Sequence, residues 1–150
     1  MQELIDLIAG RTKTHTFKHG SLQVVMRTLK EKELDEIYRD IGARATSEIG
    51  ADLLRRRYVL ANAIVSINGL PLSSFNEVQK LLSENKDMDI TEAIVKILSE
   101  ASPQSLGVLW ACYVELATLA EKEKEELKKG LVDSLLSTIS SGESTKKQDL

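Results

Sequence analysis

The chain has 150 residues, of which 42% are hydrophobic, 29% are charged and only 4% are aromatic. This length and composition predict a single domain with an aliphatic core, and the abundance of leucine, alanine, glutamate and lysine favours helix. The formal net charge of −3 argues against nucleic acid as the main partner, and a single cysteine, Cys112, excludes an intramolecular disulfide.

The lone cysteine also indicates a cytosolic protein. The sequence has no run of about 18 apolar residues, so we expect no transmembrane helix and no membrane partner. The first ten residues are too short and too acidic for a signal peptide. Residues 2–9 place four apolar side chains close together, which predicts a short helix that ends at Gly10.

A change of pattern follows at residues 12–27, where apolar and polar side chains alternate. This alternation predicts a β-hairpin with strands at about residues 13–18 and 22–27, joined by a turn at His19-Gly20-Ser21. Two strands alone are marginal in water, so the hairpin must pack on helices or pair with another chain. Its two unpaired edges are therefore candidate docking surfaces.

The rest of the chain shows the spacing of amphipathic helices. A capping-box pattern at Thr28 and Glu31 predicts the first helix start, and the β-branched run before Asn68-Gly69 predicts an extended segment with a turn. We expect helices at about residues 28–42, 46–64, 74–85, 89–102 and 103–139.

The last of these helices is apolar on nearly all sides between residues 106 and 120, which predicts a central, buried helix with Trp110 substantially buried. Residues 140–150 are polar and show no periodicity, so we expect a disordered tail. The fold class predicted is mainly α with an N-terminal β-hairpin at about residues 13–27. Residues 1–139 form a single helical domain in this interpretation.

No catalytic or metal-binding motif is found. His15 and His19 are too far in sequence from Cys112 for the tight spacing of a metal site, and Cys112 lies in the most apolar helix, where thiols usually pack inertly. No acid, base and nucleophile are coupled by spacing. We therefore expect no cofactor, no metal and no enzymatic activity.

An arginine-rich helix gives the alternative hypothesis, a small regulatory protein that binds nucleic acid. Consecutive arginines spread around a helix and cannot form one flat patch, so ion pairs with Glu48 and Asp52 at helical spacing are the favoured interpretation. The residues of this alternative are Arg39, Arg44, Arg55, Arg56 and Arg57.

The order of elements is more informative. Residues 16–24 (TFKHGSLQV) lead into residues 27–33 (RTLKEKE), and a helix then runs to residues 60–69 (LANAIVSING). This arrangement resembles small tail-assembly and baseplate-hub assembly proteins of tailed bacteriophages over about residues 14–72. In those proteins a β-type opening that ends in an arginine precedes a threonine-capped helix and an all-helical remainder.

The resemblance implies a non-enzymatic protein that acts by protein–protein docking, as an assembly chaperone or as a virion component. It would reside in the host cytoplasm or in the virion tail, with other tail or baseplate proteins or copies of itself as partners. Its candidate contact residues are Thr16, Phe17, Leu22, Gln23, Val24, Arg27, Asn68, Gly69 and Leu70.

Overall fold

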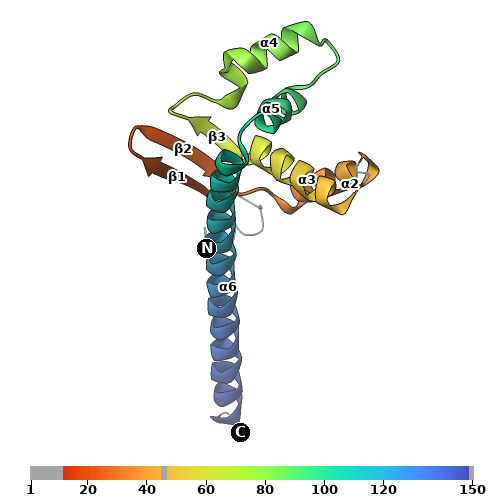
Figure 1. Cartoon of the computed structure of the whole chain (residues 1–150). Helices are drawn as coiled ribbons and strands as arrows, with labels where there is room; N and C mark the ends of the chain where they lie inside the picture. Colours follow the sequence, from red (N-terminus) through yellow and green to blue (C-terminus); the bar gives the residue numbers. More distant parts are fainter. Residues whose placement is uncertain (1–11, 45–46, 149–150) are drawn as a thin grey trace.

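The computed structural model describes residues 12–44 and 47–148, with side chains as far as residue 140 (Figure 1). The predicted fold class is confirmed, since helices and one small antiparallel sheet make up this part of the chain. The helix expected at residues 2–9 lies outside the described residues. The elements are β1 (Thr14–His19), β2 (Leu22–Arg27), α2 (Glu31–Arg44), α3 (Glu48–Ala63), β3 (Ile64–Ile67), the 3₁₀ turn η1 (Leu72–Ser74), α4 (Asn76–Glu84), α5 (Ile90–Ser99) and α6 (Pro103–Gln148).

The sheet has three strands in the order β1-β2-β3, and both pairings are antiparallel. The hairpin is regular from the pair Thr14 and Arg27 to the pair His19 and Leu22. Our expectation that both hairpin edges stay unpaired is wrong for β2, because β3 pairs with it and Val24 lies opposite Ile67. Of the two hairpin edges, β1 alone therefore remains open in the described residues.

A tight turn at Asn68 and Gly69 follows β3. Asn68 and Gly69 both adopt positive φ angles, 51° and 81°, as the central residues of a type I′ turn require. The backbone amides of Ile67 and Leu70 each donate to the carbonyl of the other, at 2.8 and 3.0 Å. This turn ends β3 immediately after it has paired with β2.

Two helix starts are capped by side chains. Ser47 Oγ accepts a hydrogen bond from the Gly50 amide at 3.1 Å, and Asp89 Oδ1 accepts one from the Glu92 amide at 2.8 Å. Each side chain satisfies a backbone donor that has no partner within its helix. These caps fix the first residues of α3 and α5.

The predicted cap at Thr28 has a different role. Its Oγ1 accepts a hydrogen bond from the Lys13 amide at 2.8 Å, which extends the sheet by one pair beyond the strands. The start of α2 is instead capped by Glu33, whose carboxylate accepts from the Lys30 amide at 3.1 Å. The helix consequently begins three residues later than the predicted N-cap at Thr28.

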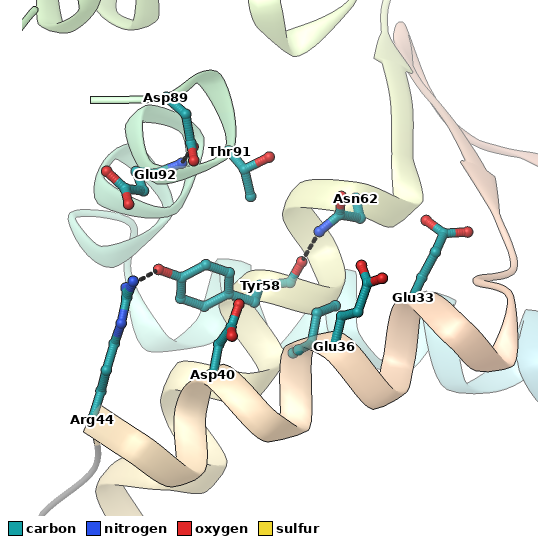
Figure 2. Close-up of a pocket in the computed structure, with 10 residues that line it drawn as sticks. Glu33, Glu36, Asp40, Arg44, Tyr58, Asn62, Asp89, Thr91 and Glu92 are labelled. Carbon is teal, nitrogen blue, oxygen red and sulfur yellow. Dashed lines mark hydrogen bonds between the residues drawn. The ribbon is translucent and has the colours of Figure 1, made fainter. Parts of the chain in front are cut away.

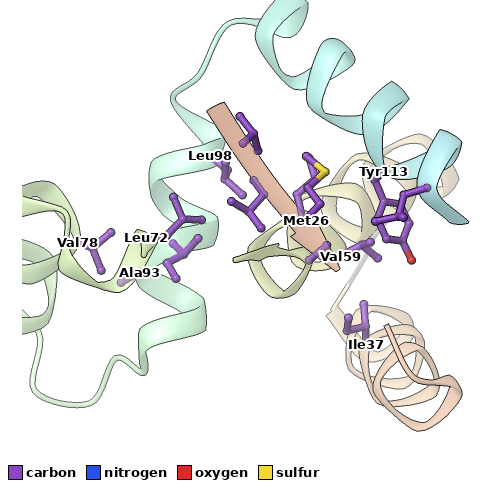
Figure 3. Close-up of a cluster of buried hydrophobic side chains, with 14 of the residues drawn as sticks. Met26, Ile37, Val59, Leu72, Val78, Ala93, Leu98 and Tyr113 are labelled. Atoms are coloured by element: carbon purple, nitrogen blue, oxygen red, sulfur yellow. The ribbon is translucent and has the colours of Figure 1, made fainter. Parts of the chain in front are cut away.

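The core lies on one face of β2. Met26 is fully buried and Val24 nearly so, and side chains from α3, α5 and α6 pack around them (Figure 3). These side chains belong to one cluster, so the core is continuous from α2 to α4. It includes Val24, Met26, Ile37, Ile41, Val59, Leu60, Ala63, Ile64, Leu72, Val78, Ala93, Leu98, Tyr113 and Leu116.

The expectation that α6 is central and buried is wrong. Its first turns bury Tyr113 and Leu116, but Trp110 is half-buried and Val108 is 64% exposed. The helix then extends away from the sheet and the other helices (Figure 1). Apolar composition did not predict burial here, because within the described residues only one face of the first turns of α6 packs against other elements.

Helix α6 also continues to Gln148, which is beyond the end predicted at residue 139. The backbone is therefore helical through most of the segment for which we expected a disordered tail. The division into a domain of residues 1–139 and a tail stays a prediction.

The packing of α6 gives a direct test. Replacing the fully buried Leu116 with alanine should lower the free energy of unfolding by about 2–5 kcal/mol, because it leaves a cavity in the core. Leu119, three residues later and 41% exposed, is the matched control, and its change to alanine should cost less than about 1 kcal/mol. Urea titration measures both, and equal losses would show that α6 is packed differently.

Candidate functional site

The main candidate site is the outer edge of β1. Thr28 donates its amide hydrogen to the Lys13 carbonyl at 2.8 Å, which fixes which residues of β1 bond to β2. Because hydrogen-bonded and non-bonded pairs alternate in an antiparallel ladder, His15, Phe17 and His19 turn their backbone groups towards β2. The backbone N–H and C=O groups of Thr14, Thr16 and Lys18 therefore point outwards, away from β2; these three residues form the open edge.

The side chains of β1 divide between the two sheet faces. His15 and Phe17 lie opposite Met26 and Val24, on the core side, with their rings edge to face at 4.7 Å between centroids. Phe17 is half-buried against the core, whereas His15 is exposed. The side chains of the open-edge residues lie on the opposite face.

Two of the predicted contact residues, Gln23 and Asn68, bind each other within the chain. The Gln23 amide donates to Asn68 Oδ1 at 2.8 Å, and the Asn68 amide donates to the Gln23 carbonyl at 2.7 Å. These bonds join β2 to the turn after β3. The expectation that Gln23 lies on an unpaired edge is therefore wrong, because Asn68, 45 residues later in the sequence, binds the backbone at that edge.

The remaining predicted contact residues have mixed positions. Val24 is buried in the core and Gly69 is in the turn. Leu22 and Leu70 are 46% and 57% exposed at the hairpin end of the sheet, and Thr16 is half-buried on the open edge. The structure thus brings the predicted set into one sheet. Whether any of these residues binds a partner stays a prediction.

Arg27 is part of an ion pair with Glu33. Its guanidinium donates two hydrogen bonds to the carboxylate, Nη1 at 3.0 Å and Nη2 at 2.7 Å. These bonds lower the pKa of the Glu33 carboxyl, although partial burial opposes the effect, and they raise the pKa of Arg27. The pair fastens the end of β2 to the first turn of α2.

A second candidate site, which sequence reasoning missed, is an acidic groove of about 270 Å³ between α2, α3 and α5 (Figure 2). Arg44 and Tyr58 join at its end through a hydrogen bond of 3.0 Å. Such a lining can attract a cationic group, but the described residues contain no cluster of histidine, cysteine and carboxylates that could hold a metal ion. The acidic residues of the groove are Glu33, Glu36, Asp40, Asp89 and Glu92.

The arginines of the nucleic-acid hypothesis contact different groups. Asp52 lies 3.9 Å from Arg55 Nη1 and 3.2 Å from Arg56 Nε, as the favoured interpretation predicted. Arg55 also covers the ring of Tyr38 at 4.9 Å, and Arg56 covers that of Trp110 at 5.3 Å.

The other three arginines of the nucleic-acid hypothesis are Arg39, Arg44 and Arg57. Arg39 is exposed on α2, and Arg57 is half-exposed on α3. No ion pair of Glu48 occurs within the part of the chain that the structure describes. Arg44 donates a hydrogen bond to Tyr58 at the acidic groove, whereas Arg55 and Arg56 both contact Asp52.

The half-buried thiol of Cys112 behaves as a packing group. Burial raises its pKa, with a further contribution from the charge of Glu115. A raised pKa keeps the thiol protonated and therefore weakly nucleophilic.

Comparison with known proteins identifies no relative: no family model, no curated protein and no solved structure matches this chain. No helix of the described residues is long and apolar enough to cross a membrane. Function must therefore be argued from the residues themselves.

The pair of Arg27 and Glu33 predicts a pH dependence. The folded-state pKa of Glu33 lies below that of an unfolded glutamate, about 4.3, so the stabilisation is present above that value and is lost as pH falls through the folded pKa. Glu33→Gln should lower Tm by roughly 1–4 °C at pH 7, since the pair is only partly buried and solvent screens it. The difference from wild type should shrink below about pH 4.

Thermal melts between pH 7 and pH 2 measure this effect. Asp35→Asn, on the exposed face of the same helix, is the control and should show no comparable convergence. A Glu33→Gln difference that stays constant down to pH 2 would contradict the assignment.

Proposed function

We propose that this chain is a non-enzymatic docking protein of the tail or baseplate of a tailed bacteriophage, acting as an assembly chaperone or as a virion component. The observation that supports this proposal is the open edge of β1, whose outward backbone groups can pair with a strand of another chain. The phage context comes from the resemblance of residues 14–72.

The character of this edge supports a docking role. Proteins usually protect exposed edges with proline, a bulge, an inward-pointing charge or charged side chains such as lysine, of which the open edge carries only Lys18. β1 contains no proline, and its register with β2 is unbroken over six residues. The bulge of this sheet lies between Val25 and Met26, at the β2–β3 pairing, so it does not distort the open edge. An added strand would meet regular, extended backbone.

The nucleic-acid alternative has less support. Counterion release requires guanidinium groups that are free to contact successive phosphates. Arg55 and Arg56 share Asp52 and stack on aromatic rings, and the neighbouring groove carries five carboxylates. A polyanion approaching this side of the molecule would therefore meet both paired arginines and negative charge.

The open edge is tested with two variants at one position. Thr16→Pro removes an outward N–H that makes no bond within the described part of the chain, and proline is tolerated on an edge strand. We expect it to reduce capture of phage tail or baseplate proteins at least tenfold while circular dichroism stays near wild type. Thr16→Val changes the side chain but keeps the N–H, so it should bind like wild type.

Lys18→Pro removes the next outward N–H and replaces Thr16→Pro if that variant is unstable. Folded proline variants that capture tail proteins as well as wild type would rule out edge docking. Mass spectrometry of purified virions separates the two roles within the proposal, because a virion component is retained and a chaperone is not.

The same capture experiment tests the arginine helix. Arg56→Glu should leave capture of tail proteins unchanged, and the wild-type protein should show no salt-dependent binding to duplex DNA at micromolar concentration. DNA binding that Arg56→Glu abolishes would instead favour the regulatory alternative.

A further inference from the structure

We infer that the partner at the open edge of β1 is a second copy of this chain, which pairs antiparallel to it about a two-fold axis at Thr16. The inference rests on the proposed docking role of this edge and names its occupant. It is carried by the positions of the outward backbone groups, by the side chains beside them and by the course of α6.

The backbone groups of the open edge are self-complementary. The outward residues Thr14, Thr16 and Lys18 are placed symmetrically about Thr16. In an antiparallel pair centred there, Thr16 lies opposite Thr16 of the second copy, and Thr14 lies opposite its Lys18. Each of these is a pair in which both residues exchange N–H···O bonds. Every outward backbone group of the edge is then satisfied.

The side chains of β1 are compatible with this antiparallel pairing centred on Thr16. On the outer face, each Lys18 lies opposite a threonine, so no like charges oppose one another. On the core face, His15 lies opposite Phe17 of the second copy, in a non-hydrogen-bonded pair where side chains come closest. The edge-to-face contact of His15 and Phe17 within one chain would thereby extend into an aromatic cluster of both chains.

Helix α6 provides a second observation. Tyr113 is buried in the core where α6 contacts β2, whereas ten residues later Glu123 pairs with Lys13, just before β1. The helix therefore crosses the ends of the strands from β2 towards β1. It then continues past the open edge, as Figure 1 shows.

The part of α6 beyond this crossing carries uncovered apolar side chains. Val132, Leu135 and Leu136 are 51%, 63% and 59% exposed. Antiparallel pairing brings the hairpin turn of the second copy, with its exposed Leu22, to the end of β1 where α6 passes. The second copy thus lies on the side where α6 is uncovered, and it adds apolar area to an interface that strand pairing alone would leave small.

The oligomeric state of the full chain tests the inference. Sedimentation equilibrium or light scattering at about 10–100 μM should give twice the monomer mass of 16.7 kDa for the wild type and for Thr16→Val. Thr16→Pro should give the monomer mass, because the N–H at the two-fold axis is lost.

The register is tested independently by crosslinking in a Cys112→Ser background. A short bis-maleimide should join Thr16→Cys to itself and should join Thr14→Cys to Lys18→Cys in a mixture of the two. Thr14→Cys alone should not crosslink, since its two copies would be about 14 Å apart along the strands. These variants keep all backbone donors, so the test stands even if the proline variant fails to fold.

Three outcomes would overturn the inference. A wild-type monomer that loses capture of tail proteins on Thr16→Pro would mean that another protein's strand occupies the edge, and the proposed function would survive. A wild-type monomer whose capture is unaffected would overturn both proposals. A dimer that tolerates Thr16→Pro and fails to crosslink at Thr16 would place the contact elsewhere.

Discussion

The structure depends on β2, the strand that is paired along both edges and that buries Val24 and Met26 on one face. Helix α6 packs directly against β2, α3 packs against β3 and α5, and the buried side chains of all three helices form one cluster with Val24 and Met26. The two strands beside β2 differ in their outer surroundings. β3 pairs with one edge of β2, where Gln23 and Asn68 exchange hydrogen bonds, and β1 is the outer strand, whose outward backbone groups have no partner among the described residues. The same constraint that builds the core therefore leaves one edge of the sheet available.

Much of this fold follows from local sequence. Alternation predicted the hairpin strands to within one residue, and helical spacing predicted the starts of α3 and α5 to within two residues. The pairing of β3 could not be predicted, because Val24 and Ile67 are distant in sequence and four β-branched or polar residues carry no information about a partner strand. The prediction that α6 is buried was wrong for a related reason. The sequence shows that this helix is apolar, but it does not show how many other elements pack against it. The acidic groove could have been found, because Glu33, Glu36 and Asp40 recur at helical spacing on one face of α2.

The distribution of charge is consistent with docking by backbone pairing. Arg27 is committed to Glu33, and Arg55 and Arg56 to Asp52 and to aromatic rings. The open edge itself contains one charged side chain, Lys18, and two threonines. Affinity at such an edge comes mainly from main-chain hydrogen bonds, which any extended strand can supply, and selectivity comes from neighbouring side chains. Here those neighbours are His15 and Phe17 on one face and the projecting helix α6 at one end.

The central claim is that the outward amides of β1 become bonded when the protein docks. Amide hydrogen exchange followed by NMR tests this claim residue by residue. We predict that the amides of Thr16 and Lys18 exchange rapidly in dilute protein and become protected in the docked state, at high protein concentration or with tail proteins added. The amide of Phe17, bonded to β2, should be protected throughout and is the internal reference. Rapid exchange of Thr16 and Lys18 in the docked state would contradict the account.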